Sequence, residues 1–429
     1  MKTTLHLQAD TEYEVDVVVV GGGTAGCFAA ISAAKKGAKT VLVEKNGILG
    51  GTMTVGGVNY PGLFFAWGKQ IIAGPCWESI QRTIEMHGAT LPQITYHSKE
   101  HWKEQIKLNT AIYAHVLDEM SRENGVEVLF HSMPISVEEK QDGVVLFVAG
   151  KEKIYCLKSK YIIDATGDGN IVSRMGYPMV QGAVQQPATL TNKLSGYNAS
   201  TFDGESIYKE IKERLAQGAL PYPELNVEKL YSYLKRYILD IHVPCENCAD
   251  SLTKGKLETE ARKKIVTIAN FLRTISGLEN LHISDVCNEC GVRETKRVIG
   301  EHTITEEEYL KGVVYPDAVS YAYYPIDVHV LDGVEKVYLK EAIVPTIPFK
   351  ALVPKDANRV LVCGRLVSSD RAANSALRVE ACCMAMGQVA GCATAVLSRT
   401  NESIKQLSYE ELCESLESIG AIVPTQKDK

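Results

Sequence analysis

The sequence predicts an α/β fold built around a parallel sheet, and three observations carry this prediction. The run Val17–Val20 is apolar at every position, as expected of a strand that is covered on both faces. A glycine-rich turn and a helix of small residues follow it, and a second apolar strand, Thr40–Val43, completes a β-α-β unit. Two further buried strands, at 161–165 and 359–363, each lead directly into a turn that contains glycine. This repeated order of strand and glycine turn is typical of parallel α/β sheets.

Five other elements are expected outside the predicted insertion. They are a helix over 99–124, a strand over 126–130, an antiparallel hairpin made of 135–139 and 143–149, a long helix of small residues over about 375–398, and an amphipathic helix over 408–422. No repeat of fixed period interrupts them, which excludes solenoids and propellers.

Composition divides the chain into one discontinuous domain and one insertion. Residues 186–345 change to long polar helical stretches interrupted by proline and tyrosine, which predicts an inserted α+β substrate or cap domain. The first domain then consists of residues 10–185 and 346–400, and residues 401–429 form a C-terminal helical tail. The length of 429 residues fits two or three domains.

Charge and hydropathy narrow the classes of partner. The net charge of −6 leaves no basic surplus for binding phosphate backbones, so nucleic acid is not an expected partner. No apolar run reaches the length of a membrane-spanning helix, and the first residues lack the apolar stretch of a signal peptide. We therefore expect a cytoplasmic protein without a membrane partner, whereas its oligomeric state stays open.

The first glycine turn has the spacing of a dinucleotide-binding loop. Gly21, Gly23 and Gly26 stand in G-x-G-x-x-G order between a strand and a helix. Such glycines permit a tight turn and a close approach of the backbone to a pyrophosphate, which the helix N-terminus attracts. Glu44 ends the next strand, where a carboxylate can bind both ribose hydroxyls. The sequence therefore predicts a dinucleotide site rather than an ordinary turn beside a surface acid.

Three features favour FAD over NAD as that dinucleotide. Gly50-Gly51-Thr52 forms a second glycine turn that gives room to a continuing pyrophosphate and ribityl chain. The segment Ala165-Thr166-Gly167-Asp168 places a carboxylate at a strand end close to glycine, and Gly364-Arg365 with the following helix provides N–H donors for an isoalloxazine ring.

Seven motifs together resemble one known family. They are VVVVGGGTAGCFAA, GILGGTMTVGGVN, IIDATGDGNI, QQPATL, GVRETKRVIGEHTIT, YPIDVH and NRVLVCGRLVSSDRAANSALRVEACCMAMGQVAG. With them the sequence is similar to the soluble FAD-dependent oxidoreductases of the fumarate reductase and succinate dehydrogenase flavoprotein type. The resemblance covers nearly the whole chain. It implies a Rossmann-like FAD/NAD(P)-binding domain with an inserted substrate domain, and noncovalent FAD.

The loops and the resemblance together give a predicted set of cofactor residues. The set comprises Gly21, Gly23, Thr24, Ala25, Gly26, Glu44, Lys45, Gly50, Gly51, Thr52, Ala165, Thr166, Gly167, Asp168, Gly364, Arg365, Arg378 and Gly387. We expect these residues to line one FAD site.

Two arginines and one histidine are candidates for the chemistry. Arg293 and Arg297 are four residues apart, so they would share a face if the segment were helical and could clamp a carboxylate. The alternative is a solvated charged face together with Glu294 and Lys296; the resemblance favours Arg293 as an active-site residue. His329 can exchange the proton that accompanies hydride transfer, although a lone histidine is more often structural.

Twelve cysteines are many for a reducing compartment, where we expect thiols rather than disulfide staples. Cys27, Cys363, Cys382, Cys383 and Cys392 stand in apolar contexts and are expected to fill the core. The pairs Cys245-x-x-Cys248 and Cys287-x-x-Cys290 have three interpretations: a zinc site, a redox-active dithiol, or unconnected thiols. The resemblance predicts no metal.

The sequence thus predicts an enzyme that transfers a hydride between flavin N5 and a small organic substrate, with a carboxylate as one candidate. Two alternatives stay open. One is an FAD-binding protein in which the flavin is structural or senses redox state. The other is a flavoprotein that acts on a macromolecule. The net negative charge of the chain argues against this second alternative.

Overall fold

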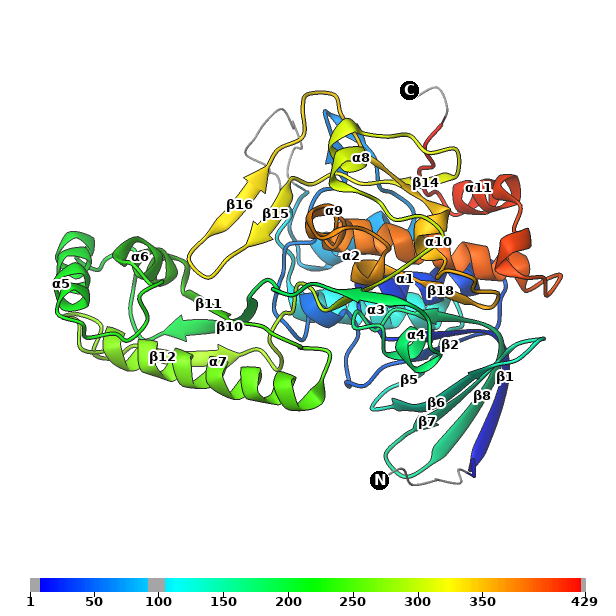
Figure 1. The fold of residues 1–429 in the computed structure, drawn as a ribbon. Coiled ribbons are helices and arrows are strands. Elements are labelled where there is room, and N and C mark those ends of the chain that lie inside the picture. Colours follow the sequence, from blue (N-terminus) through cyan, green and yellow to red (C-terminus); the bar gives the residue numbers. More distant parts are fainter. Residues whose placement is uncertain (1–7, 92–104, 426–429) are drawn as a thin grey trace.

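A seven-stranded sheet forms the centre of the computed structural model, which describes residues 8–91 and 105–425. Its parallel part has the order β5-β2-β1-β8, and β18 also pairs with β8. These strands are β1 (Thr11–Val20), β2 (Thr40–Val43), β5 (Glu127–Leu129), β8 (Ile154–Asp164) and β18 (Val360–Val362). The predicted α/β fold with a parallel sheet is therefore confirmed (Figure 1).

An antiparallel hairpin extends this sheet beyond the first half of β8. It consists of β6 (Met133–Glu139) and β7 (Val144–Ala149), as the alternating pattern of the sequence predicted. The second half of β8 pairs with β18 instead, so the carboxyl ends of β2, β1, β8 and β18 meet at one edge of the sheet.

Two helices from opposite ends of the chain pack on each other and on the sheet. They are α1 (Thr24–Lys35) and α10 (Glu380–Leu397). A Cβ atom at Gly387 would stand 2.1 Å from the carbonyl oxygen of Ala25, and one at Gly391 would stand 2.2 Å from that of Ala29. Only glycine at these two positions lets the helix backbones approach so closely.

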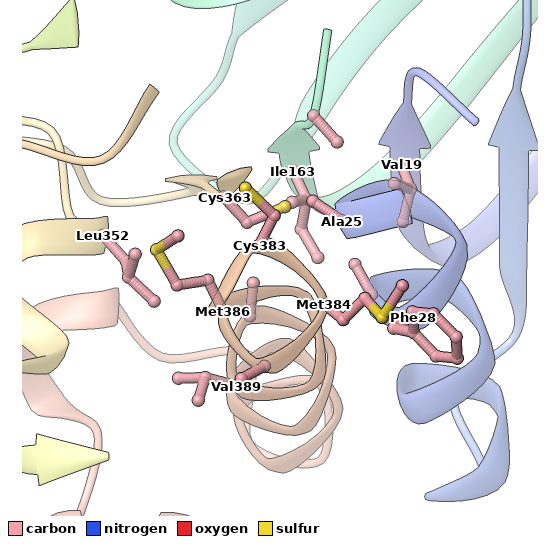
Figure 2. Packing of buried hydrophobic residues seen from close by; sticks show 14 of the residues in the cluster. Val19, Ala25, Phe28, Ile163, Leu352, Cys363, Cys383, Met384, Met386 and Val389 are labelled. Atoms are coloured by element: carbon pink, nitrogen blue, oxygen red, sulfur yellow. The ribbon is translucent and has the colours of Figure 1, made fainter. Parts of the chain in front are cut away.

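Helix α10 is also the helix that best meets the length and composition of a membrane span among the described residues. However, 94% of its most apolar window is buried inside the protein. Its side chains Cys383, Met384 and Met386 lie among apolar side chains of other segments, such as Cys363, Phe28 and Leu352 (Figure 2). All five cysteines expected in the core are buried, and this burial raises the pKa of each thiol.

Two predicted helices have different bounds in the structure. The small-residue helix predicted over 375–398 is divided, because Val379 adopts an extended conformation between α9 (Arg371–Leu377) and α10. The helix predicted over 99–124 becomes α3 (Thr110–Glu123), because the side chain of Asn109 caps its first N–H groups. Residues 99–104 of that prediction lie outside the described residues.

A second unit extends from the sheet domain and contains its own apolar cluster, which runs from Ala188 to Val292 (Figure 1). Its sheet has the order β11-β10-β12. Its elements are β10 (Ala188–Ser195), α5 (Gly204–Ala216), α6 (Val227–Arg236), β11 (Ile238–Val243), α7 (Ser251–Leu272) and β12 (His282–Val286). Most of the buried apolar residues between Val298 and Ile326, which the predicted insertion of 186–345 includes, pack in the first cluster. They do so because the chain returns to the sheet domain after Val292.

Short elements connect these two units and complete the chain. They are β3 (Phe65–Ala66), β4 (Lys69–Gln70), α2 (Pro75–Met86), α4 (Asn170–Arg174), β9 (Met179–Gln181), β13 (Lys296–Val298), α8 (Glu306–Lys311), β14 (Ala318–Tyr321), β15 (Ile326–His329), β16 (Val334–Val337), β17 (Thr346–Pro348) and α11 (Tyr409–Ser418). The pairs β9–β13 and β15–β16 lie where the two units meet.

Candidate cofactor and active site

The first glycine turn has the close contacts that its spacing predicts. Gly21 has φ 102°, and a Cβ atom there would stand 2.6 Å from the carbonyl oxygen of Ala165 at the end of β8. A Cβ atom at Gly26 would stand 1.8 Å from the carbonyl oxygen of Gly21. Side chains at these positions would separate α1 from the two strand ends, so the turn requires glycine.

Glu44 lies beside this turn. Its Oε2 accepts a hydrogen bond of 2.6 Å from the backbone N–H of Gly22, and its Oε1 accepts one of 2.7 Å from Asn46. Burial raises the pKa of the carboxyl group, against the effect of these two hydrogen bonds. Each oxygen keeps a lone pair that can accept a hydrogen bond from a further donor.

The second glycine turn packs directly on the first. The N–H of Gly50 donates to the carbonyl oxygen of Gly22 over 2.8 Å, and a Cβ atom at Gly51 would stand 2.8 Å from Cα of Gly23. Thr52 follows and faces Gly291 of the second unit. A Cβ atom at Gly291 would stand 3.6 Å from the methyl carbon of Thr52. Lys45, in contrast, forms a half-exposed ion pair of 2.6 Å with Glu289, so its ammonium group points to the second unit.

The loop after β8 is organised by a carboxylate that the sequence analysis did not select. Asp164 is fully buried and accepts hydrogen bonds from the N–H groups of Thr166, Ile171 and Val172. It thereby fixes the loop that carries Gly167 and Asp168. Its signal in the sequence was an acid at the end of an apolar strand, one position before the turn.

Arg365 connects this loop to the second unit. Its Nε donates to the carbonyl oxygen of Gly167 over 2.6 Å, and its Nη atoms bind Asp168 and the carbonyl oxygen of Val292. Gly364 has φ 77° and lies against Ala25 at the start of α1. The residues predicted around Gly21, Glu44, Gly51, Asp168 and Arg365 therefore converge at the carboxyl edge of the sheet.

Both helices that begin at this edge lack a side-chain cap at their N-termini. The first N–H groups of α1 are thus available to an anionic group such as a pyrophosphate, whereas in α10 the N–H of Ala381 already donates to the carbonyl oxygen of Pro61 over 2.7 Å. Thr24 donates its hydroxyl to the carboxyl group of Glu380, so the first turns of α1 and α10 are joined. Gly387, which we predicted to line the cofactor, lies instead two turns into α10 against α1, because its missing side chain serves helix packing.

A second polar cluster lies next to the start of α10. Arg378 stands two residues before Glu380 and donates through Nη2 to Oε1 of Gln186 over 3.3 Å and to the carbonyl oxygen of Asp327 over 3.1 Å. The N–H of His329 donates to the same Gln186 oxygen over 2.9 Å, and its Nε2 lies 3.1 Å from Oδ2 of Asp327. Arg378 thus belongs to this cluster rather than to the glycine loops.

Arg293 is the other cation of this cluster. Its Nη1 donates to the carbonyl oxygen of Pro187 over 2.6 Å. Burial, followed by the charge of Arg378, lowers the pKa of Arg293 to about 9. The imidazole of His242 meets that of His329 edge to face, with ring centres 5.4 Å apart. Burial lowers the pKa of His329 to about 4, so its imidazole is neutral at pH 7.

Several buried polar atoms of this cluster have no hydrogen-bond partner among the described residues. They are Nε2 of Gln186, Oδ1 of Asp327, Nδ1 of His329 and Nε of Arg378. Each buried polar atom left without a hydrogen bond costs about 1–3 kcal/mol. Four such atoms on residues that are hydrogen-bonded to one another are unusual in a folded interior. The cluster therefore has the free donors and acceptors of a binding site.

Arg297 does not join this cluster, which corrects the predicted arginine pair. The segment around it is not helical: Arg297 lies in β13, and its Nε donates to the carbonyl oxygen of Ser369 over 3.0 Å. It also faces Glu294 at 3.9 Å. Because Arg297 lies in β13 and Arg293 precedes that strand, no helix brings the two side chains together, and each donates to a different carbonyl oxygen: Arg293 to that of Pro187 and Arg297 to that of Ser369.

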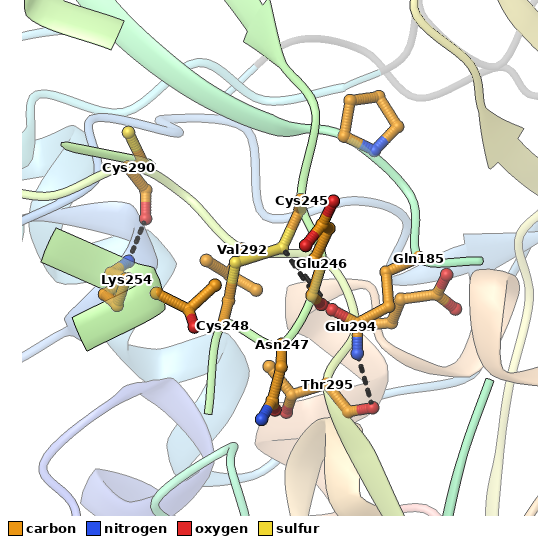
Figure 3. The surroundings of a disulfide bond; sticks show 12 residues. Gln185, Cys245, Glu246, Asn247, Cys248, Lys254, Cys290, Val292, Glu294 and Thr295 are labelled. Carbon is orange, nitrogen blue, oxygen red and sulfur yellow. Dashed lines mark hydrogen bonds between the residues drawn. A yellow bond between two sulfur atoms is a disulfide. The ribbon is translucent and has the colours of Figure 1, made fainter. Parts of the chain in front are cut away.

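Only one of the two C-x-x-C pairs forms a disulfide bond. The sulfur atoms of Cys245 and Cys248 are bonded, whereas Cys287 and Cys290 are free thiols (Figure 3). This bond differs from our expectation of thiols, yet it joins residues only three positions apart, so it constrains the chain little. Within the described ranges, no group of three or more histidine, cysteine or acidic residues is arranged to hold a metal ion.

The parallel sheet, its two uncapped helix N-termini and the glycine turns define a dinucleotide-binding protein of the Rossmann type. The model of the family described as "FAD dependent oxidoreductase" matches residues 16–416. The chain therefore belongs to the FAD-dependent oxidoreductases, and the expected cofactor is FAD.

Curated relatives match shorter stretches. The chain is 27% identical over 172 residues to the thiamine thiazole synthase of Methanococcus vannielii, which covers 38% of this chain and 60% of that protein. It is 37% identical over 111 residues to the fumarate reductase (cytochrome) of Shewanella frigidimarina, which covers 24% and 19%. The chain thus aligns with less than two thirds of each of these relatives.

Among solved structures, a geranylgeranyl bacteriochlorophyll reductase-like protein from Thermoplasma acidophilum aligns with 95% of this chain and 83% of its own. The sequence identity is 14% and the TM-score is 0.43.

Proposed function

We propose that this oxidoreductase acts on a small organic anion, most simply a carboxylate, held by the cluster of Arg293, Arg378, Gln186, Asp327 and His329. FAD, when bound, supplies the site that accepts or donates a hydride at N5. The glycine turns would hold its pyrophosphate and Glu44 its ribose, because these residues converge at one edge of the sheet. Arg378 of the polar cluster is two residues before Glu380 in the chain. The carboxyl group of Glu380 accepts a hydrogen bond from Thr24 in the first glycine turn.

The charge of the cluster carries this proposal. Two guanidinium groups, Arg293 and Arg378, face one carboxylate, Asp327, and a neutral imidazole. Asp240 also acts on Arg293, but it is shared with Arg236 at 3.3 Å. Glu294 also acts on Arg378, but it is paired with Arg371 at 3.1 Å. A buried excess of positive charge is stabilised by an anion, and guanidinium groups bind carboxylates in fixed geometry.

His329 supplies the proton chemistry in this arrangement. When Nε2–H donates to Asp327, the unpaired Nδ1 keeps a lone pair that can take a proton from the substrate. Asp327 orients the ring, and Gln186 fixes the backbone of His329. This tautomer is inferred from the hydrogen bonds around the ring.

Arg293→Ala and Arg293→Lys test the proposal on FAD-loaded protein. A panel of small carboxylates and the matching amides is titrated while the flavin absorbance is followed, and turnover is then measured with each ligand. We expect carboxylates to bind the wild type and both variants to lose at least about tenfold in affinity, since a charged hydrogen bond contributes about 1.5–3 kcal/mol. Arg82→Ala, far away on α2, is the matched control.

Equal binding of carboxylates and amides, or unchanged affinity for carboxylates in both variants, would contradict the proposal that the substrate is an anion. If no donor or acceptor changes the flavin spectrum at all, the structural or redox-sensing alternative gains instead. A small-molecule substrate rather than nucleic acid is part of the same proposal and is supported by the net charge of −6. A cytoplasmic location without a membrane partner also stays part of the proposal.

A further inference from the structure

The bonded pair Cys245–Cys248 lies at the edge of the second unit, in the loop between β11 and α7. Both cysteines are buried, whereas Glu246 and Asn247 between them are exposed, so the loop itself is at the surface. Figure 3 shows Gln185 of the neighbouring segment next to the pair. The sulfur of Cys245 lies 3.5 Å from Oε1 of Gln185.

Three consecutive residues connect this pair to the polar cluster. Gln185 contacts Cys245 and donates through Nε2 to the carbonyl oxygen of Thr295 over 3.1 Å. Gln186 accepts from both His329 and Arg378, and the carbonyl oxygen of Pro187 accepts from Arg293. We call Gln185–Pro187 the connecting segment. Within the described part of the chain, the side-chain hydrogen bonds of this segment have their other ends at Cys245, at the cluster or in residues 294–295.

The contact at Cys245 depends on the oxidation state of its sulfur. A disulfide sulfur carries no hydrogen, so it cannot donate to the amide oxygen 3.5 Å away. After reduction, the Cys245 S–H can donate to Oε1 of Gln185, and the link between Cys245 and Cys248 is lost. Reduction therefore changes the forces on the first residue of the connecting segment.

We propose that Cys245–Cys248 is a reversible thiol–disulfide switch whose state is transmitted through Gln185–Pro187 to the His329–Arg378 cluster. Its effect on catalysis rests on the proposed function of that cluster, whereas the switch itself and the transmission do not. In reducing compartments, disulfides are characteristically transient and redox-sensing, which fits a pair that closes so short a loop.

The redox step requires a dithiol reductant. One thiolate of the reductant attacks a sulfur of the pair, forming a mixed disulfide and releasing the other cysteine as a thiol after it takes a proton. The second thiol of the reductant then displaces the first cysteine. The reductant is oxidised by two electrons and gives up two hydrogens, which the two cysteines receive.

Alkylation tests the switch. FAD-loaded protein is incubated with oxidised or reduced dithiothreitol, treated with iodoacetamide and analysed as peptides by mass spectrometry. We expect the peptide with Cys245 and Cys248 to be protected under oxidising conditions, to gain an alkyl group on each sulfur after reduction, and to return to protection on reoxidation. Alkylation of this peptide after full oxidation, or irreversible loss of the bond, would overturn the proposal.

Histidine resonances test the transmission without any need for substrate. The ring nitrogen signals of His329 and His242 are recorded in histidine-labelled holoprotein, oxidised and reduced, and are assigned with His329→Gln and His242→Gln. We expect the His329 signal to shift on reduction of the wild type and of Gln181→Leu. In Gln185→Leu the cysteines should still cycle but the shift should be lost.

Gln181 is the matched control because its amide also contacts the cysteine loop, at Asn247 over 3.4 Å, but lies on the exposed strand β9. An unshifted His329 signal in the wild type, or an equal shift in Gln185→Leu, would disprove transmission through the connecting segment. Failure of carboxylate binding alone would leave both of these results intact and would count only against the proposed function.

Discussion

Glu44 shows how a single carboxylate at the end of a strand can prepare a cofactor site. Its two oxygens already accept hydrogen bonds from the N–H groups of Gly22 and Asn46, so the side chain is fixed in the position that we propose for binding a ribose. Lys45, its neighbour, is committed to Glu289 in the second unit. Adjacent charged residues therefore serve different parts of the molecule.

Glu44→Ala should weaken FAD binding roughly 10- to 100-fold, because hydrogen bonds to a charged group contribute about 1.5–3 kcal/mol. Lys45→Ala should leave the affinity nearly unchanged, since its exposed ion pair contributes little. The dissociation constant of FAD, measured from its fluorescence on titration of the deflavinated protein, checks both variants. An unchanged constant in Glu44→Ala would exclude a ribose contact.

The buried histidine predicts a dependence of stability on pH. The folded-state pKa of His329 is about 4 against 6.5 in the unfolded chain, so between these values the unfolded state binds the extra proton. Stability should therefore fall as the pH drops from about 6.5 towards 4, by about 3 kcal/mol in all, at about 1.4 kcal/mol per unit. Below pH 4 this contribution should level off.

Denaturant unfolding of wild type and His329→Gln over pH 4–8 measures this contribution as a difference in slope. The variant should lose less stability than the wild type between pH 6.5 and 4, and the two slopes should agree between pH 7 and 8, where the imidazole is uncharged in both states. Parallel curves over the acidic range would contradict the lowered pKa.

At the scale of the element, the crossing of α1 and α10 depends on the missing side chains of Gly387 and Gly391. Gly387→Ala would place a carbon 2.1 Å from the backbone of Ala25, which the two helices can relieve only by separating. Overpacking of this kind costs about 1–3 kcal/mol or more. The melting temperature should fall accordingly.

Gly255→Ala provides the control for this change. Gly255 also lies inside a helix, α7, but no atom stands within 4 Å of the added carbon. Because alanine favours helices over glycine by up to about 1 kcal/mol, this variant should be as stable as the wild type or more so. A melting temperature that responds equally to both substitutions would mean that helix propensity, and not the crossing, decides the result.

Element by element, the sequence predicted best where local signals repeat. The strands at 17–20 and 40–43 and the hairpin at 135–149 follow from periodicity alone. The interruption of the helix at Val379 and the strand at Arg297 were not predicted, because neither valine nor arginine breaks a helix in the way that proline or glycine does. Pairing of β13 with β9, more than a hundred residues earlier, decides the conformation there.

For the whole molecule, the sequence predicted which loops belong together but not which side chains meet. Glycine spacing located the edge of the sheet. The cluster of Gln186, Asp327, His329 and Arg378 could not be derived in this way, because its members come from three distant segments and share no local pattern. Two of the motifs quoted for the family resemblance, QQPATL and YPIDVH, contained three of these four residues.

Cofactor binding should stabilise the whole molecule, because the loops at the sheet edge come from residues 21–26, 44–52, 165–168 and 364–365. Free FAD at a hundred times its dissociation constant should add about 2.7 kcal/mol to the free energy of unfolding. Thermal unfolding at increasing FAD concentrations checks this. A melting temperature independent of FAD would show that these loops do not form its site.

The contact between α1 and α10 also sets an order of events during synthesis. A ribosome-bound chain contains the first glycine turn early, but the helix that covers α1 lies some 350 residues further on, at Glu380–Leu397. Until that stretch has left the exit tunnel, the buried face of α1 has no partner. The unit from Ala188 to Val292, whose apolar cluster is formed by its own residues, is complete earlier. Nascent chains should therefore finish the inserted unit first and acquire a closed flavin domain last.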